Sequence, residues 1–269
     1  MRIVRYLWEG EPRWGLVEGD VVLAASGDPF QGLRPGEAVG PIDQLTLLPP
    51  VVPSKIIAIG LNYLDHITED APQFQVPDNP IIFLKPPSSL VGHGAPIVLP
   101  QGAEHVDSEA ELAVVIGRRA RYVRPEQALD VVLGYTCSND VSARDYQFRD
   151  GQWARAKGFD TFTPLGPMIV TDLDPRDLAI TSRVNGTVHQ QSTTAKLLFS
   201  VPELIAFISR VMTLEPGDVI MTGTPAHPPR MQPGDVVEIE IAGIGVLRNV
   251  AVAETLPDGG TFTWRLSRE

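Results

Sequence analysis

The chain contains little cysteine, few basic residues relative to acidic ones and no long apolar stretch. Each of these shortages excludes a class of site or of binding partner. The single cysteine, Cys137, excludes an intramolecular disulfide and a thiolate metal cluster, which leaves oxygen and imidazole as metal ligands. We expect Cys137 to be a small core residue. With 22 basic against 33 acidic residues the formal net charge is −11, which argues against a nucleic-acid partner.

No apolar run approaches the roughly 18 to 20 residues that would span a membrane, so we expect no membrane partner. The opening stretch MRIVRYLWEGEPRWG is interrupted by charge and proline within a few positions, which is not typical of a signal peptide. A cytoplasmic location and a small-molecule partner follow as expectations. The 269 residues suffice for one large β-rich domain, or for a modest domain with a small appendage.

The N-terminal fifth of the chain predicts a small separate unit. Residues 3–8 and 14–23 are strand-like and are separated by turn residues, which indicates a small antiparallel unit. Residues 26–54 are crowded with glycine and proline and predict a linker. We therefore divide the chain into residues 1–54, a small N-terminal domain with its linker, and residues 55–269, the main domain.

The main domain is dominated by short β-branched runs bounded by turn residues, and this pattern predicts an α+β fold that is mostly β. Asn185-Gly186 predicts a two-residue hairpin turn. The clearest helix begins at Ser200, where Glu203 completes a capping box. A shorter helix is expected over residues 125–130. The strand-like runs are residues 56–60, 81–84, 97–99, 111–117, 132–139, 168–171, 180–184, 219–222, 236–241 and 245–253.

Three carboxylates carry the strongest chemical signal. Glu109 and Glu111 are two residues apart at the start of an apolar run, so on a strand both side chains project from one face. Asp140 ends another strand-like run, from which it could reach the same point. Three carboxylates without a soft ligand favour a hard cation, magnesium first, with manganese or calcium as alternatives. Taken alone, a Glu-x-Glu pair more often marks a solvated strand end.

The stretch GLNYLDHITED offers a candidate base. His66 and Glu69 stand three residues apart, on one face of a short helix, with Asn62 as its expected N-cap. A histidine steered by a carboxylate is the usual arrangement for activating a water molecule. An ordinary helix ion pair is the plainer alternative. Residues 60–80 contain few packing side chains, so this region could form a lid over a substrate.

Cationic and hydroxyl side chains complete the candidate site. Arg144 and Lys157 belong to a basic cluster in an otherwise acidic chain, and such a cluster suits binding of a carboxylate and stabilisation of an enolate or oxyanion. Lys157 precedes a stretch that should be buried. Thr224 in TGTP follows a strand and adds a hydroxyl. Lys85 ends a strand and could point into the site, although lysines in such positions are usually solvated.

Read together, these segments resemble the fumarylacetoacetate hydrolase family over residues 55–252. The first fifty residues are similar to the small extra domain found in many bacterial members. Six separated motifs agree in order, which makes the resemblance specific. They are GLNYLDHITE, FLKPPSSLVGHG, DSEAELAVVIG, GYTCSNDVSARDYQ, KGFDTFTPLGP and LEPGDVIMTGTP.

The resemblance implies a mixed β-roll or sandwich, usually a homodimer, with magnesium bound by the three carboxylates. It makes His66 and Glu69 a water-activating dyad on a lid. It also implies that Lys157, Gln147 and Thr224 contact the substrate, and we add Arg144 and Lys85 as candidate substrate ligands. Two departures stand out: Ile59 replaces an aspartate of the full-length fumarylacetoacetases, and Ala226-His227-Pro228-Pro229 replaces a Gly-rich turn.

These residues and the resemblance lead to a magnesium-dependent hydrolase. It would cleave a carbon–carbon bond of an acylpyruvate or fumarylpyruvate-like diketo acid, with the metal stabilising an enolate. One alternative at the same site is an isomerase of 2-hydroxyhepta-2,4-diene-1,7-dioate, of the 5-carboxymethyl-2-hydroxymuconate type used in aromatic catabolism. Another is a 2-oxo acid decarboxylase. A third, of a different class, is a non-catalytic binding module stabilised by its metal.

Overall fold

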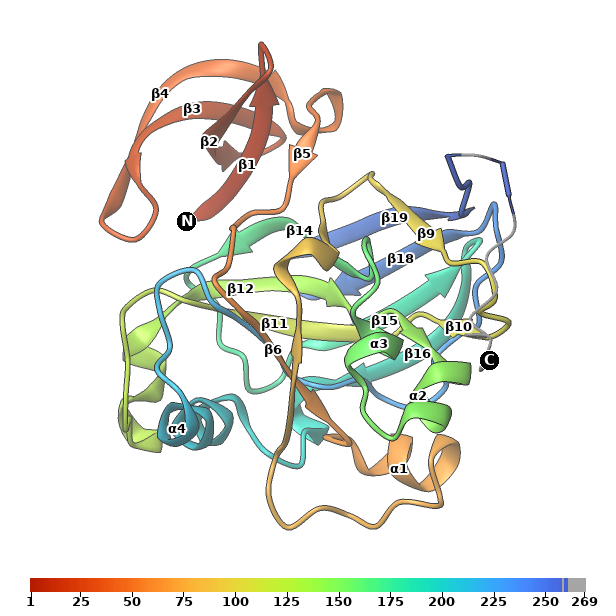
Figure 1. The fold of residues 1–269 in the computed structure, drawn as a ribbon. Helices are drawn as coiled ribbons and strands as arrows, with labels where there is room; N and C mark the ends of the chain where they lie inside the picture. Colours follow the sequence, from red (N-terminus) through yellow and green to blue (C-terminus); the bar gives the residue numbers. More distant parts are fainter. Residues whose placement is uncertain (258, 261–269) are drawn as a thin grey trace.

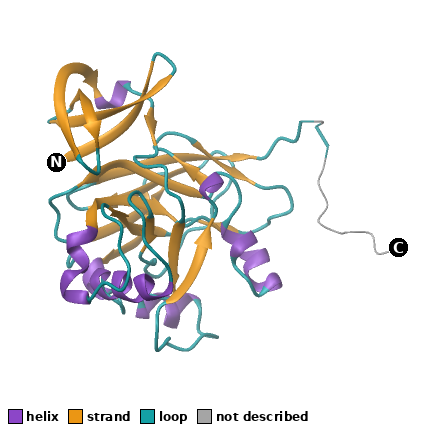
Figure 2. Ribbon diagram, turned by 60° about the vertical axis from the view of Figure 1, so that its left-hand side comes forward, coloured by secondary structure: helices purple, strands orange, loops and turns teal. Residues whose placement is uncertain are grey.

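The computed structural model describes all residues except 258 and 261–269, and two sheets make up most of it (Figures 1 and 2). The first ten strands are β1 (Arg2–Trp8), β2 (Glu11–Glu18), β3 (Val21–Asp28), β4 (Gly32–Pro41), β5 (Leu47–Leu48), β6 (Ile56–Gly60), β7 (Ile81–Lys85), β8 (Leu90–Val91), β9 (Pro96–Leu99) and β10 (Val106–Asp107). The later strands are β11 (Ala110–Ile116), β12 (Val132–Asn139), β13 (Ser142–Ala143), β14 (Thr163–Val170), β15 (Ala179–Val184), β16 (Thr187–Thr193), β17 (Val219–Met221), β18 (Val236–Ile241) and β19 (Gly245–Ala253). The fold is thus mostly β, as predicted.

The α-helices are short except for one. They are α1 (Leu64–Asp70), α2 (Arg144–Asp150), α3 (Ala154–Lys157) and α4 (Val201–Val211), and the 3₁₀ helices are Ile42–Gln44, Pro87–Ser89, Pro125–Val131 and Thr194–Lys196. Helix α4 has the predicted capping box between Ser200 and Glu203. The helix expected over residues 125–130 is instead a 3₁₀ helix. No helix among the described residues is long and apolar enough to cross a membrane.

The expected linker over residues 26–54 is wrong, because much of it is strand. Among the described residues, strand β4 lies at the end of the large sheet and pairs with β3 alone, and β5 pairs with β1. An edge strand can contain proline, since the missing N–H need not face a partner, and this is why Pro35 and Pro41 fit within β4. The glycine and proline content therefore marked an irregular edge strand with register shifts rather than a linker.

The large sheet runs from the N-terminal strands into the rest of the chain. Its order is β4-β3-β2-β1-β14-β12-β11-β17-β6-β7, and β1 joins the two parts by pairing antiparallel with β14. Every residue of β11 is buried between its neighbours β12 and β17. The predicted strand that follows Glu109 is therefore an interior strand of the large sheet, paired with β12 along its length and with β17 over residues 113–115.

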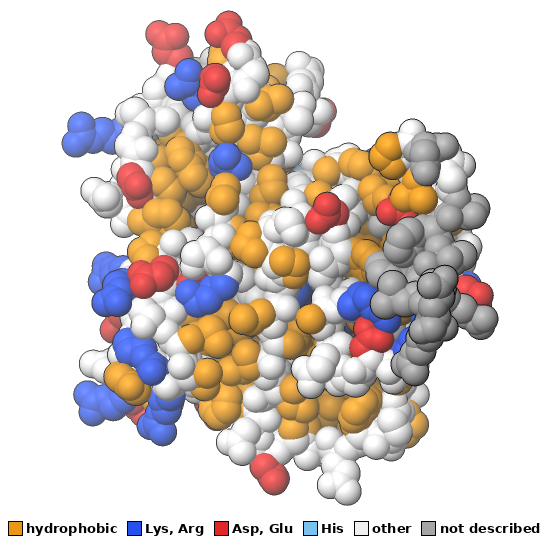
Figure 3. All heavy atoms as spheres, viewed as in Figure 1, with side chains coloured by type: hydrophobic (Ala, Val, Ile, Leu, Met, Phe, Trp, Pro, Cys, Tyr) orange, Lys and Arg blue, Asp and Glu red, His pale blue; other side chains and the backbone are white. Residues whose placement is uncertain are grey.

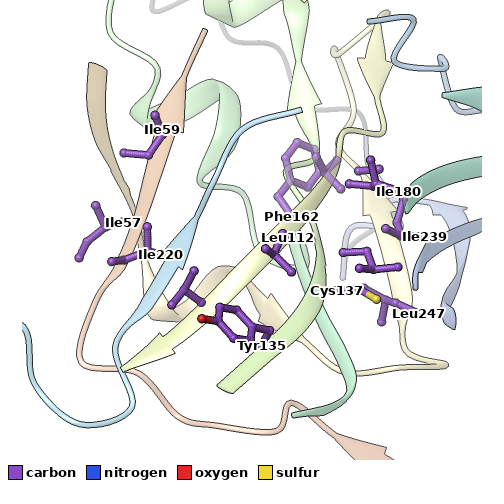
Figure 4. Close-up of a cluster of buried hydrophobic side chains, with 14 of the residues drawn as sticks. Ile57, Ile59, Leu112, Tyr135, Cys137, Phe162, Ile180, Ile220, Ile239 and Leu247 are labelled. Atoms are coloured by element: carbon purple, nitrogen blue, oxygen red, sulfur yellow. The ribbon is translucent and has the colours of Figure 1, made fainter. Parts of the chain in front are cut away.

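A second, five-stranded sheet has the order β16-β15-β18-β19-β9 and packs against the first. The core between them contains Leu112 and Cys137 from one sheet with Ile239 and Leu247 from the other (Figure 4). Burial raises the pKa of the Cys137 thiol to about 12, so it is a neutral core side chain, as predicted. The hairpin between β15 and β16 turns at Asn185-Gly186, with both residues at positive φ.

Helices α1, α2 and α3 lie together at one end of the molecule, away from α4 (Figure 1). On the face shown in Figure 3, basic side chains gather at the edge beside α4, while apolar and acidic side chains are spread over the remainder. The end with α1 to α3 is where the chain turns that follow β6 and β12 meet the start of β11. This end contains the candidate residues.

Candidate metal and substrate site

Two neighbouring strands bring the three predicted carboxylates together. Glu109 precedes β11 and Glu111 is its second residue, while Asp140 follows β12 directly. The two strands are antiparallel, and Ala110 lies opposite Asn139 in their register. Each of the three carboxylates has an oxygen within 4.8 Å of the others, and all three side chains are buried. The strand interpretation of the Glu-x-Glu pair is therefore correct, and the solvated strand end is excluded.

Two buried lysines balance part of this charge. Lys157 Nζ lies 2.8 Å from Glu109 Oε2, 2.5 Å from Asp140 Oδ2 and 2.7 Å from Ser142 Oγ, so each ammonium proton has an acceptor. Burial alone would lower the pKa of Lys157, but Asp140 and Glu109 raise it above its ordinary value. In this arrangement Lys157 fixes the carboxylates in place, which is a different contact from the predicted one with substrate.

Lys85 lies behind the carboxylates rather than in the cavity. Its Nζ donates to Asp140 Oδ1 at 2.5 Å and to the Phe162 carbonyl at 2.9 Å, and its side chain is buried. Burial lowers its pKa, against the opposing effect of Asp140. The alternative that Lys85 is solvated is therefore wrong. Its contacts indicate a structural partner of Asp140 rather than a substrate ligand.

Glu111 is the carboxylate that lacks a basic partner among the described residues. Its Oε2 accepts the Gly223 backbone N–H at 2.8 Å, whereas the nearby lysines contact Glu109 and Asp140 instead. Burial, and then the charges of Asp140 and Glu109, raise the pKa of Glu111 well above its ordinary value. A bound divalent cation would remove this repulsion, and three buried carboxylate oxygens suit a hard ion such as magnesium. The residues present therefore fit a metal site.

Arg144 connects the carboxylates to the helical side of the site. It is the first residue of α2; its Nη2 lies 2.5 Å from Glu109 Oε1, its Nε lies 2.7 Å from Asp107 Oδ2 and its Nη1 lies 2.8 Å from Gln147 Oε1. Burial alone would raise the pKa of Glu109, but Lys157 and Arg144 outweigh it and the pKa is well below the usual range. Sequence reasoning found Arg144 and Gln147 but missed Asp107.

The signal for Asp107 was present in the sequence. Asp107, Glu109 and Glu111 follow one another at intervals of two, as expected for side chains on one face of an extended segment. The structure confirms this alternation, because the same guanidinium bridges Asp107 and Glu109. Charged residues at this spacing therefore indicated a wider site than the pair that we singled out.

An inner compartment is formed around the carboxylates. Its wall includes Thr224, whose Oγ1 accepts from Gln190 Nε2 at 2.9 Å, and the Trp153 ring. Gly60 allows that ring to come close, since a Cβ at Gly60 would lie 2.3 Å from it. The lining residues are Ile59, Gly60, Leu61, His66, Phe83, Glu109, Glu111, Asp140, Arg144, Gln147, Trp153, Lys157 and Thr224.

His66 faces this compartment from α1, but its partner is not the predicted one. His66 Nδ1 lies 2.9 Å from Asp70 Oδ2, while Glu69 Oε2 lies 3.0 Å from His227 Nε2. The spacings of three and four residues both fall on one helix face, so the sequence could not separate the two carboxylates. Asn62 is not the helix cap either. Its amide is buried and bonds to the backbone of residues 199 and 222.

An outer compartment continues from the inner one, and the two share Leu61, His66, Arg144 and Gln147. It combines polar groups with aromatic and other apolar side chains, which gives it space for a second part of a substrate. Sequence reasoning missed the other residues of this compartment because they come from four segments that are separate in the sequence. Its other lining residues are Asp70, Ala71, Gln73, Phe74, His105, Asp107, Phe148 and Pro228.

Comparison with known proteins agrees with this geometry. Residues 55–252 match the family model described as fumarylacetoacetate (FAA) hydrolase C-terminal, and residues 1–50 match an Rv2993c-like N-terminal model. The chain belongs to the fumarylacetoacetate hydrolase family. The family resemblance inferred from the six motifs is thereby confirmed, including the mostly β fold.

Members of the fumarylacetoacetate hydrolase family that resemble this chain have names for different reactions. It is 45% identical over 224 residues, 79% of this chain and 71% of the other, to the mitochondrial oxaloacetate tautomerase Fahd2a of Rattus norvegicus. The structure of 5-carboxymethyl-2-hydroxymuconate delta-isomerase from Mycobacterium smegmatis is 44% identical, with a TM-score of 0.86 over 94% of this chain and 100% of that one. Maleylpyruvate hydrolase from Sphingobium is 32% identical, with a TM-score of 0.79 over 94% and 100%.

Proposed function

We propose that this protein is a magnesium-dependent hydrolase that cleaves a carbon–carbon bond of an acylpyruvate or fumarylpyruvate-like diketo acid. The observation that carries the proposal is that His66 and the three carboxylates line one compartment together with Gln147. A base, a cation site and a hydrogen-bonding amide around one cavity are the groups that such a hydrolysis requires.

When bound by Glu109, Glu111 and Asp140, the cation would supply Lewis acidity toward the oxygens of a 2-oxo acid. All three ligands are carboxylates, which is why we propose magnesium, with manganese or calcium as alternatives. Lys157 and Arg144 hold Glu109 and Asp140 in position by the contacts described above. Lys157 and Arg144 thus keep the carboxylate oxygens that would bind the cation close together, and their role is to preorganise the metal site.

His66 would accept a proton from water as the water oxygen attacks the distal carbonyl carbon. The bond between that carbon and the neighbouring CH₂ then breaks, and its electron pair leaves with the pyruvate part as an enolate. The acyl part becomes a carboxylic acid, and protonation of the enolate carbon gives pyruvate. Gln147 and Thr224 line the same compartment and would orient the substrate.

The two connected compartments suit a substrate with two parts. The 2-oxo acid end would lie in the inner compartment with the carboxylates, and the acyl group would extend past His66 into the outer one. Because His66 lines both compartments, it would lie beside the carbonyl that joins the two parts of such a substrate. This placement favours cleavage at that bond over reaction at the far end of the substrate.

The second candidate is isomerisation, tautomerisation or decarboxylation of a 2-oxo diacid in the same cavity. The similarity to the rat tautomerase and to the Mycobacterium smegmatis isomerase supports it. These reactions also pass through an enolate but need no attacking water. The two candidates therefore differ in whether His66 activates water.

A direct test is to incubate the protein with magnesium and acetylpyruvate, and to follow loss of the diketone absorbance together with release of pyruvate. His66→Ala should lower hydrolysis by at least about 100-fold while retaining most decarboxylation or tautomerisation of oxaloacetate. A wild-type protein that leaves acylpyruvates intact but isomerises or decarboxylates a diacid would overturn the hydrolase proposal. Equal loss of both reactions in the variant would contradict the division of roles.

A non-catalytic binding module and the assembly state are tested separately. The binding module predicts that magnesium raises the melting temperature without turnover of any member of a broad 2-oxo acid panel. The homodimer remains a prediction from the family resemblance, and the cytoplasmic location remains a prediction from the composition and opening stretch of the sequence. Light scattering on the eluted protein would give the number of subunits directly.

A further inference from the structure

Strand β16 lies at an edge of the five-stranded sheet, yet it buries one polar side chain completely. Its other side chains are exposed or half-buried, and the buried one is Gln190. Burying an amide is costly unless its hydrogen bonds are made. Gln190 is not among the residues that line the inner or the outer compartment. Its contacts with the protein therefore have to account for its burial.

The amide of Gln190 connects two segments of the site. Its Oε1 accepts the backbone N–H of Ala110 at 3.0 Å, and Ala110 stands between the two glutamates of the metal site. Its Nε2 donates to the Pro225 carbonyl at 2.7 Å and to Thr224 Oγ1 at 2.9 Å. Both amide protons are therefore in use, and one side chain joins the carboxylate strand to the segment that contains Thr224.

The polarity of these contacts fixes the orientation of the amide. A backbone N–H can only donate and a carbonyl can only accept, so a flipped Gln190 amide would oppose both Ala110 and Pro225. The second proton of Nε2 therefore points at Thr224 Oγ1. An amide nitrogen does not accept hydrogen bonds, so the Thr224 oxygen is the acceptor in this contact and the hydroxyl retains its own proton.

The hydroxyl proton of Thr224 is left for the inner compartment. No described residue accepts it, although Thr224 is buried and lines that compartment. Neighbouring donors of the same segment are already in use. Thr222 Oγ1 donates to the Leu112 carbonyl, at 2.9 Å. The Gly223 N–H donates to Glu111 Oε2, so Thr224 is the residue of this segment that offers a donor to an occupant of the compartment.

We infer that Gln190 is a positioning residue, which sets the Thr224 hydroxyl as a hydrogen-bond donor to an anionic oxygen of the substrate. This inference rests on the part of the proposed function that places a 2-oxo acid end in the inner compartment. Carboxylate and enolate oxygens are acceptors, and a hydrogen bond to a charged acceptor is stronger than one between neutral groups. A substrate anion beside three carboxylates needs donors of this kind in addition to a cation.

The first experiment is a double-mutant cycle on ligand binding. Calorimetry with magnesium and oxalate, a dianion that only accepts hydrogen bonds, measures Kd without turnover. Thr224→Val should raise Kd by roughly 30-fold and Gln190→Met by roughly tenfold. If Gln190 acts through Thr224, the double variant should match Thr224→Val within about twofold. A double variant weakened by the product of the two factors would overturn the inference, and so would an unchanged Kd in Gln190→Met.

Two control variants accompany the cycle. Gln191→Met changes the exposed neighbour of Gln190 on the same strand and should leave Kd within about twofold of the wild type. Thr224→Ser retains the hydroxyl and should keep Kd within about threefold. Equal weakening by Gln191→Met would contradict a specific role for Gln190. A Thr224→Ser variant as weak as Thr224→Val would show that the hydroxyl is not the group that binds oxalate.

The second experiment uses the intact Gln190 side chain, so it does not depend on the folding of a Gln190 variant. Its side-chain amide signals are followed by NMR on ¹⁵N-labelled protein with magnesium, before and after oxalate is added. Oxalate should shift the Gln190 signals and leave those of Gln191 in place, and Thr224→Val should abolish the response. Unchanged Gln190 signals, or a response that survives Thr224→Val, would overturn the inference.

These readouts distinguish the role of Gln190 from the proposed function. If the cycle shows the coupling but no acylpyruvate is hydrolysed, the hydrolase proposal fails and the role of Gln190 stands. If acylpyruvates are hydrolysed while the two substitutions are additive, the hydrolase proposal stands and the role of Gln190 is wrong. Absence of magnesium-dependent oxalate binding in the wild type would contradict the inference, because it requires an anion in the inner compartment.

Discussion

Glu109, Glu111 and Asp140 form the carboxylate wall of the cavity, within or next to the paired strands β11 and β12 of the large sheet. His66 instead lies on α1, the seven-residue helix of the expected lid. The wall is positioned by backbone pairing on both sides of β11 and by buried lysines. A two-turn helix has little stability of its own, so α1 depends on side-chain and loop contacts for its place. Changes in the wall should therefore affect stability and metal binding, and changes in the lid should affect rate.

The largest expected effect comes from Glu111, the metal-site carboxylate that has no ion pair with a basic side chain in the described part of the chain. Glu111→Gln should remove the rise in melting temperature caused by magnesium and lower turnover by at least about 1000-fold. Without metal the variant should be at least as stable as the wild type, because a repelling charge is gone. Glu126→Gln, on the exposed 3₁₀ helix, is the control. Full magnesium stabilisation of Glu111→Gln would refute the assigned metal site.

The next effect tests whether the wall depends on its buried counter-charges. Lys85→Met leaves Asp140 without one of its two lysines, and removal of one partner of a buried ion pair costs about 3 to 5 kcal/mol. Urea unfolding of the metal-free protein would measure this loss. The exposed Lys196→Met should change the free energy of unfolding by less than about 0.5 kcal/mol. Equal stabilities for the two variants would mean that the wall is held by its strands alone.

A smaller effect is expected where the wall meets the lid. Gly60→Ala would place a Cβ against the Trp153 ring, and moving that ring should lower kcat/KM by roughly tenfold. Adding Trp153→Leu should restore part of the space, and steady-state kinetics of the single and double variants would measure the recovery. If Gly60→Ala matches the wild type, the Trp153 ring does not shape the inner compartment.

The smallest effect is a pH dependence confined to the lid. Burial alone would raise the pKa of Asp70, but the hydrogen bonds from His66 and the His227 backbone lower it below 3.8. The stabilisation by Asp70 is therefore complete above the unfolded value and is lost as the pH falls through the lower, folded value. The melting temperature of Asp70→Asn should lie below the wild type by about 2 °C at neutral pH. This difference should vanish in acid, and a constant offset would contradict the shift.

Local pattern was enough wherever a single element carried the signal. The alternation that places Glu109 and Glu111 on one strand face, the capping box of α4 and the turn at Asn185-Gly186 were all read from neighbours in the sequence. Prediction from local pattern failed where the contacting residue is distant in the sequence. The edge position of β4 explained residues mistaken for a linker, and Asn62 was drawn away from its helix by the backbone of two distant segments.

By itself, the sequence determined the strand character, the three carboxylates and the family, because each depends on residue types at fixed short spacings. The tertiary structure decided which charge meets which. In the folded chain Lys85 forms an ion pair with Asp140, and Lys157 forms ion pairs with the carboxylates rather than remaining free for substrate. Asp70, not Glu69, contacts His66. Spacings of three and four residues share one helix face, so only the loop that carries His227, more than 150 residues further along the chain, could distinguish them.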